Sequence, residues 1–167
     1  MAKLQSDLKE FIALLNSHRA EYIVVGGHAV AFHGYPRFTG DIDFFLRATA
    51  DNAERVLTVL KAFGFGDLQI GISDLITPNR VIQLGRPPNR IDLLTSISGV
   101  EFDHAWSSRV STVLDGEHVS FLGLNELIRN KRASDRDKDR AESPNFLRSL
   151  NAREMAHSNP EPHQQAT

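Results

Sequence analysis

The sequence has no cysteine among its 167 residues. Disulfides, thiolate zinc sites and cysteine nucleophiles are therefore excluded. It also has no apolar run near the ~18 residues that a membrane span needs. The N-terminal stretch MAKLQSDLKEFIALLNS mixes charged and apolar positions, unlike the apolar core of a signal peptide. We therefore expect a cytoplasmic protein with no membrane segment.

Neither sign of charge is in large excess, because 19 Lys and Arg residues nearly balance 21 Asp and Glu residues and leave a net charge of -2. This value argues against a protein that is coated with positive charge for gripping nucleic acid, although it allows a local basic patch. A hydrophobic content of 41% is sufficient for a core. The length predicts one domain over residues 1–150, and the polar stretch 151–167 is expected to be a disordered tail.

Hydrophobic periodicity and turn residues predict the order of helices and strands. Helices are expected at 3–17, 28–33, 51–63, 100–107 and 124–133, with a further helical segment over 135–150. Strands are expected at 22–25, 41–46, 80–84, 90–95, 110–114 and 118–122. Asp115-Gly116 between the last two strands is typical of a hairpin turn. The pattern predicts an α+β fold with a central mixed β-sheet flanked by helices.

Three aspartates stand where burial is expected. Asp41 and Asp43 begin a predicted strand, DIDFFL, so their side chains share one face while Ile42 points to the other, into the core. Asp92 lies within another apolar strand, RIDLLT. Unpaired carboxylates in such places are energetically costly.

Divalent cations would remove that cost. Magnesium prefers carboxylate and phosphate oxygens together with water, and two such ions can hold a phosphoryl group during in-line displacement. We therefore predict that Asp41, Asp43 and Asp92 are both the metal ligands and the catalytic residues for two Mg²⁺ ions. Asp41 and Asp43 would bind both ions, and Asp92 would complete the site that activates an acceptor hydroxyl.

A nucleotide-binding segment is predicted beside these carboxylates. Gly26-Gly27 follows the strand at 22–25, and glycine lets the backbone approach a phosphate closely. Arg37 and Thr39, just before Asp41, could add a cation and a hydroxyl.

The pattern V-V-G-G-x(13)-D-I-D-F, followed by an aspartate in an apolar strand, resembles the polymerase-β-type nucleotidyltransferase superfamily. Within that superfamily, GGHAVAFHGYPRFTGDIDFFL is most similar to the AbiEii-like minimal nucleotidyltransferases, which are associated with toxin–antitoxin systems. The segment LNELIRNKRASDRDKDRAE is similar to that group's downstream helix. The resemblance implies that Lys131 contacts the phosphates of an NTP and that Arg136, Lys138 and Asp139 line the same cleft.

The resemblance leaves several functions open. It implies transfer of an NMP from an NTP to an acceptor hydroxyl, with RNA such as a tRNA 3′ end as the acceptor and a cognate antitoxin as a protein partner. Adenylylation of a protein hydroxyl by an antitoxin-type enzyme is one alternative, with a toxin as partner. A non-catalytic nucleotide-binding module is another.

Simpler interpretations exist for individual motifs. A single Asp-x-Asp is often a turn or a helix cap, and Gly-Gly is often a plain strand-to-helix turn. His28 and His33 are interpreted mainly as surface or core histidines, and the basic run near Lys131 could be a solvated helix face. The hypothesis of an active site therefore depends on these motifs occurring together.

Overall fold

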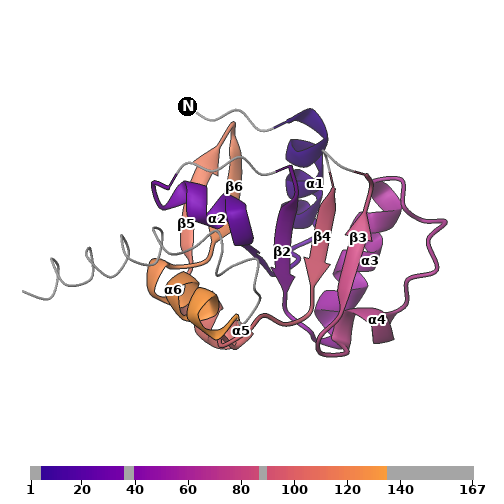
Figure 1. Ribbon diagram of the computed structural model, residues 1–167. Coiled ribbons are helices and arrows are strands. Elements are labelled where there is room, and N and C mark those ends of the chain that lie inside the picture. Colours follow the sequence, from indigo (N-terminus) through magenta and orange to yellow (C-terminus); the bar gives the residue numbers. More distant parts are fainter. Residues whose placement is uncertain (1–4, 36–39, 87–89, 135–167) are drawn as a thin grey trace, which may run out of the picture.

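A computed structural model of the chain describes residues 5–35, 40–86 and 90–134 (Figure 1). The helices are α1 (Ser6–Ser17), α2 (Gly26–Phe32), α3 (Ala50–Ala62), α4 (Ile72–Ile76), α5 (Phe102–Ser107) and α6 (Leu124–Ala133). The strands are β1 (Tyr22–Val25), β2 (Ile42–Leu46), β3 (Val81–Leu84), β4 (Ile91–Leu94), β5 (Val110–Leu114) and β6 (Glu117–Phe121).

The strands form one six-stranded sheet in the order β3-β4-β2-β1-β6-β5. β2 pairs with β4 and β1 pairs with β6 in parallel, while the other three pairs are antiparallel. The prediction of an α+β fold with a central mixed sheet flanked by helices is confirmed. The strand order departs from the chain order, so β4 lies directly beside β2.

One face of the sheet packs on α1. Phe44 of β2 is fully buried, and its ring meets those of Phe11 and Tyr22 edge to face, with centroids 5.4 and 5.5 Å apart. Ile42 shares this face by the alternation of the strand and is also buried. The prediction that Ile42 points into the core is therefore confirmed, and Phe44 shares that face.

The opposite face carries the intervening residues of β2, Asp43 and Phe45. Phe45 packs edge to face on Phe102 of α5, with a centroid separation of 5.1 Å. On the face of Phe44, Phe121 of β6 is the register partner of Val24, and its ring stacks on that of Phe32 of α2 at 4.2 Å. The two residues that follow Asp43 in β2, Phe44 and Phe45, therefore pack against aromatic rings on opposite faces of the sheet.

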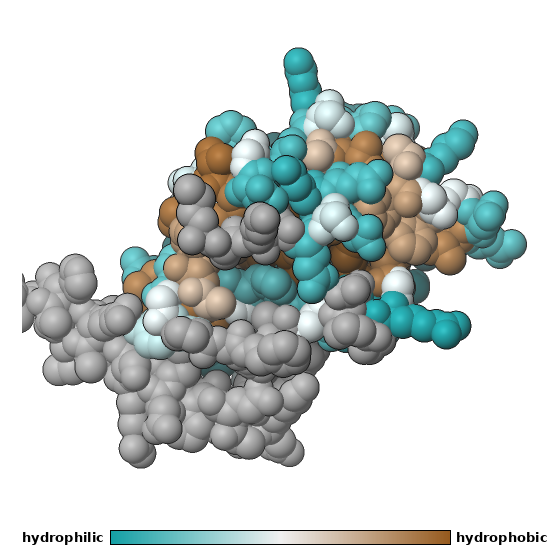
Figure 2. All heavy atoms as spheres, turned by 90° about the horizontal axis from the view of Figure 1, so that it is seen from above, coloured by the Kyte–Doolittle hydropathy of each residue, from teal (hydrophilic) through white to brown (hydrophobic). Residues whose placement is uncertain are grey.

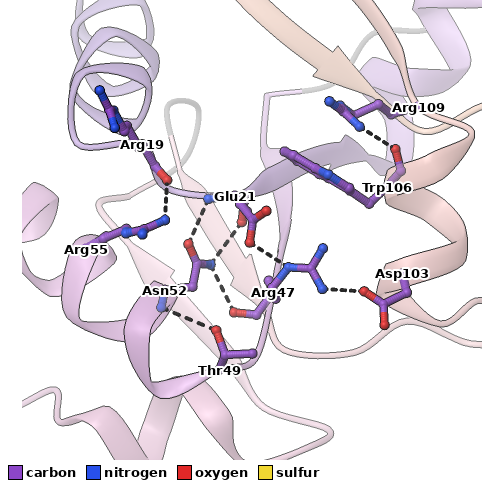
Figure 3. Close-up of polar contacts among 9 residues, drawn as sticks. All are labelled: Arg19, Glu21, Arg47, Thr49, Asn52, Arg55, Asp103, Trp106 and Arg109. Atoms are coloured by element: carbon purple, nitrogen blue, oxygen red, sulfur yellow. Dashed lines mark hydrogen bonds and ion pairs between the residues drawn. The ribbon is translucent and has the colours of Figure 1, made fainter.

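A polar network fixes the chain just outside β1 and β2, at the end of these strands away from Asp43 (Figure 3). The buried Asn52 side chain accepts from Glu21 N at 2.7 Å and donates to the carbonyls of Glu21 and Arg47 at 3.0 and 2.9 Å. Arg47 also pairs with Glu21 and Asp103, and its guanidinium lies 4.6 Å from the centroid of Phe102. The network joins α3 and α5 to the sheet.

Several predicted boundaries are wrong by a few residues. Asp41 precedes β2 instead of opening it, and α2 begins at Gly26 instead of 28. α4 was not predicted, because five residues are too few to show helical periodicity. The predicted helix over 135–150 and the tail 151–167 lie outside the described residues.

Hydrophilic residues cover much of the face seen from above, and hydrophobic residues show between them (Figure 2). The large hydrophobic side chains exposed in the described ranges are Leu68, Ile76, Val81, Val110 and Val113. None of the helices in those ranges is long and apolar enough to cross a lipid bilayer.

Candidate active site

Asp43 and Asp92 are direct neighbours across two parallel strands. Their Cα atoms are register partners in the pairing of β2 with β4, so the backbones lie about 4.8 Å apart. Both side chains leave the sheet on the same face, close enough for Asp92 to raise the pKa of the Asp43 carboxyl. Asp92 is only 7% exposed. The structure thus brings together two of the three aspartates that the sequence singles out.

The environment of Asp43 disfavours its ionised form. Burial raises the pKa of its carboxyl to about 7, and the negative charge of Asp92, the hydrogen bond to Asp92 and the charge of Asp41 act in the same direction. Nearby Arg90 acts the other way. Two carboxylates at this separation repel each other, and a bound cation would relieve that repulsion.

Arg90 connects Asp41 to this pair. Its Nε lies 2.9 Å from Asp92 Oδ1, and its Nη2 lies 3.2 Å from Asp92 Oδ2 and 2.8 Å from Asp41 Oδ2. Arg90 was not predicted as a site residue, although the sequence carries a signal for it. Arg90 stands two residues before Asp92, and this spacing places both side chains on one face of an extended chain.

Gly26 packs directly against the carboxylate of Asp43. Its φ is +66°, a left-handed conformation that favours glycine, and a Cβ at this position would lie 2.2 Å from Asp43 Oδ2. The end of β1 therefore needs glycine for two separate reasons, and the space that glycine leaves is the space that the Asp43 carboxylate fills. Gly27 follows within α2.

Comparison with known proteins identifies the family of this chain. A family model described as "Nucleotidyltransferase of unknown function (DUF6036)" matches residues 2–157. This chain belongs to the DUF6036 nucleotidyltransferase family. A crystal structure of a "putative nucleotidyltransferase" from Thermotoga maritima is 12% identical, with a TM-score of 0.54 over 91% of each chain. That likeness is evidence for the fold alone, and no curated protein matches the chain.

Membership of DUF6036 supports the predicted chemical class, a nucleotidyltransferase. The match over residues 2–157 includes every residue predicted for the site. The family description names no acceptor, metal or partner, so the narrower AbiEii-like assignment stays a prediction.

Other predicted site residues of the DUF6036 chain are only partly described. Arg37, Thr39, Arg136, Lys138 and Asp139 lie outside the described residues. Lys131 is half-buried in the last turn of α6. That turn is held against the loop after β4, because Asn130 Nδ2 donates to Ser98 O at 2.9 Å. Contact of Lys131 with a nucleotide stays a prediction.

The two histidines of α2 and its C-cap differ in their surroundings. The ring Nε2 of His33 lies 2.7 Å from Leu122 O, so His33 joins α2 to the segment after β6. This contact fits its interpretation as a packing residue. His28 lies in the first turn of α2, and burial lowers the pKa of its imidazole. At neutral pH His28 is therefore neutral.

The residues present fit a hard divalent cation at Asp43 and Asp92. They supply carboxylate oxygens, the ligands that Mg²⁺ prefers, and their mutual repulsion gives a cation a favourable place to bind. In the ranges that the structure describes, no group of three or more His, Asp or Glu side chains is gathered as metal ligands. Asp41 instead reaches the pair through Arg90.

Proposed function

We propose that this DUF6036 protein is a magnesium-dependent nucleotidyltransferase that transfers an NMP from an NTP to an acceptor hydroxyl. The observation that carries the proposal is the Asp43–Asp92 pair. Two strands far apart in the sequence place their only aspartates opposite each other, against a glycine with no side chain. A purely structural sheet position has no need of two adjacent carboxylates, because they destabilise the fold.

In the proposed reaction, the acceptor oxygen forms a bond to the α-phosphorus of the NTP. The bond from that phosphorus to the oxygen bridging to the β-phosphate breaks, pyrophosphate leaves, and the proton of the acceptor hydroxyl passes to solvent. Two Mg²⁺ ions, when bound, supply the positive charge that stabilises the attacking and leaving oxygens. The protein supplies position and charge, as in other phosphoryl transfers.

Individual residues have distinct proposed roles. Asp43, with Asp41, would hold both ions, and Asp92 would complete the site nearer the acceptor. Gly26 and Gly27 would let the donor phosphates approach the backbone where α2 begins. The basic residues Lys131, Arg37 and the hydroxyl of Thr39 would contact the same phosphates.

For the acceptor we propose RNA, such as a tRNA 3′ end, with a cognate antitoxin as regulator. Support comes from the resemblance to AbiEii-like enzymes and from the cationic last turns of α6, where Arg129, Lys131 and Arg132 lie within four residues. Backbone phosphates of RNA bind such basic groups. Protein adenylylation uses the same transfer chemistry with a different acceptor, and it is the alternative outcome of the experiment.

The experiment incubates the protein with Mg²⁺ and each α-labelled NTP, in one arm with total tRNA and in the other with protein acceptors. We expect label on RNA from the wild-type protein. Asp43→Asn and Asp92→Asn should each lower the rate by several powers of ten, on the order of 10³-fold or more. Asp67→Asn is the matched control, because Asp67 is exposed.

The result also decides between the alternatives. Label on protein alone would show that the acceptor is a protein and not RNA, with the same nucleotidyl-transfer reaction. Full activity in Asp43→Asn would contradict the assignment of the site. Nucleotide binding without transfer to either class of acceptor would favour a non-catalytic binding module.

A further inference from the structure

Arg90 occupies the position between two carboxylates that the proposed function assigns to a metal. Its Nη2 lies 2.8 Å from Asp41 Oδ2 and 3.2 Å from Asp92 Oδ2, so one nitrogen bridges the two residues. Asp41 and Asp92 would hold a cation through the carboxylate oxygens that Arg90 now contacts. The guanidinium and a metal ion therefore cannot occupy this position together.

The second contact of Arg90 strengthens its hold on Asp92. Nε donates to Oδ1 at 2.9 Å while Nη2 donates to Oδ2, so the guanidinium contacts both oxygens of one carboxylate. The Asp92 side chain is 10% exposed and that of Arg90 is 26% exposed. The guanidinium is therefore more accessible to solvent than the carboxylate, and it can move away from Asp92 toward solvent.

A displaced guanidinium needs a new anionic partner. An NTP bound with magnesium brings phosphate oxygens to the same carboxylates, and a guanidinium binds phosphate through two parallel hydrogen bonds. Arg90 precedes β4 by one residue, at the edge where β1 ends and β2 begins. The same edge holds Gly26, the proposed site of the donor phosphates.

We propose that Arg90 is a positioning residue that takes the place of the metal in the nucleotide-free protein and transfers to the donor phosphates when magnesium and NTP bind. This inference rests on the proposed function. Metal binding alone must expel Arg90 into solvent, whereas metal binding with NTP gives Arg90 a phosphate partner. Binding of metal and binding of nucleotide are therefore coupled, each strengthening the other by the same factor.

The experiment measures Mn²⁺ affinity by electron paramagnetic resonance of the free ion, with and without a non-hydrolysable ATP analogue. In the wild-type protein we expect the analogue to tighten Mn²⁺ binding about tenfold. Arg90→Gln should bind Mn²⁺ alone about tenfold more tightly than the wild type, and the analogue should then add little. Arg80→Gln, which removes an exposed arginine before β3, should behave like the wild type.

Arg90→Lys separates the inferred role from a simple change of charge. Lysine keeps the positive charge between Asp41 and Asp92 but lacks the planar fork that binds phosphate through two bonds. We expect Mn²⁺ affinity near that of the wild type without nucleotide, together with weaker coupling to the analogue. A merely structural role of Arg90 predicts weaker Mn²⁺ binding in Arg90→Gln, because the carboxylates would lose their orientation.

The outcomes distinguish the two proposals. If Arg90→Gln binds Mn²⁺ no more tightly than the wild type, the role of Arg90 is overturned. The metal site still stands in that case if Asp43→Asn abolishes Mn²⁺ binding. If Mn²⁺ binding does not depend on Asp43 in any of these proteins, both the role of Arg90 and the proposed metal site are overturned. Thermal unfolding of each variant in EDTA shows whether Arg90→Gln is folded, and Arg90→Lys provides the test if it is not.

Discussion

At the scale of single residues, Gly26 and Asp43 depend on each other. Gly26 has a φ of +66°, and a Cβ there would lie 2.2 Å from Asp43 Oδ2. We expect Gly26→Ala to lower the free energy of unfolding by roughly 2 kcal/mol or more, because it adds a left-handed alanine, itself worth about 1 kcal/mol, and displaces the carboxylate. Nucleotidyl transfer should fall with it. Urea unfolding and the transfer assay measure the two losses.

Gly64 is the matched control for that substitution. Its φ is +102°, also left-handed, but a Cβ there would meet no atom within 4 Å. Gly64→Ala therefore carries the backbone strain without the contact, and it should leave transfer unchanged. Equal loss of transfer in both variants would show that Gly26 does not shape the site.

The raised pKa of Asp43 predicts a dependence of stability on pH. The carboxyl has a pKa of about 7 in the folded protein, against about 3.9 in an unfolded chain. Between these values the folded protein binds more protons at Asp43, so the contribution of Asp43 to stability is greatest below about pH 4 and falls as pH rises through about 7. An asparagine at this position carries no charge to desolvate. In EDTA, Asp43→Asn should therefore exceed the wild type in stability at pH 8.5, on the order of 1–2 kcal/mol after screening by water and Arg90, with little difference near pH 4.

Urea titrations of both proteins at several pH values measure this difference. Asp67→Asn serves as the control, since it removes an exposed aspartate. A stability difference between Asp43→Asn and the wild type that stays constant from pH 4 to 8.5 would contradict the assignment of the shift to Asp43.

At the scale of helices and strands, strong local patterns allowed accurate prediction. β1, β5 and α6 have the predicted bounds. β1 is a buried run that ends at Gly26, β5 ends at the turn Asp115-Gly116, and α6 begins after Gly123 with a periodic buried face. The Asp115-Gly116 hairpin is confirmed, with φ of +50° and +84° at the two residues. The helix α4 was missed, and its main local signal is Asp74, whose Oδ2 accepts from Gly71 N at 2.9 Å.

The register between strands could not be predicted from local patterns. The sequence indicates that Asp43 and Asp92 lie in strands, but their pairing depends on β4 joining β2 in parallel, with β1 on the other side of β2. Long-range packing of both sheet faces decides that order. The contact of Arg90 with Asp92 is local, but its bridge to Asp41 follows from the same pairing, and the sequence alone does not show it.

The packing of elements also predicts where the fold is sensitive. Asn52 of α3 is 1% exposed, and its amide makes three hydrogen bonds to the backbone beside β1 and β2. Asn52→Ala removes the side-chain partner of Glu21 N and of the Arg47 carbonyl, while the Glu21 carbonyl keeps its bond from Arg47 N, so we expect a loss of roughly 3 kcal/mol in the free energy of unfolding. Asn130→Ala removes one exposed hydrogen bond and should lose less than about 1 kcal/mol. Similar losses in chemical denaturation of the two variants would show that the Asn52 network does not hold α3 to the sheet.

At the scale of the whole molecule, the sheet collects three separated segments at one edge. The chain leaves β1 at Gly26, enters β2 after Asp41 and enters β4 after Arg90. The network of Glu21, Arg47 and Asn52 fixes the other end of β1 and β2, about four residues or ~13 Å from Asp43 along the strand. This network and the paired carboxylates therefore lie at opposite ends of the same strands, one with satisfied polar groups and the other with repelling charges.

That division predicts how the folded protein responds to ligands. Mg²⁺ with a non-hydrolysable NTP analogue should raise the melting temperature of the wild type, because both bind the folded site and neutralise its carboxylates. At 100 times the dissociation constant the gain is about 2.7 kcal/mol. Asp43→Asn and Asp92→Asn should each lose most of this gain while remaining folded. KCl at matched ionic strength is the control for screening, which acts on charges across the whole surface. If KCl alone raises the melting temperature as much as Mg²⁺ with the analogue, or if both variants show the full rise, the stabilisation does not arise at these paired aspartates.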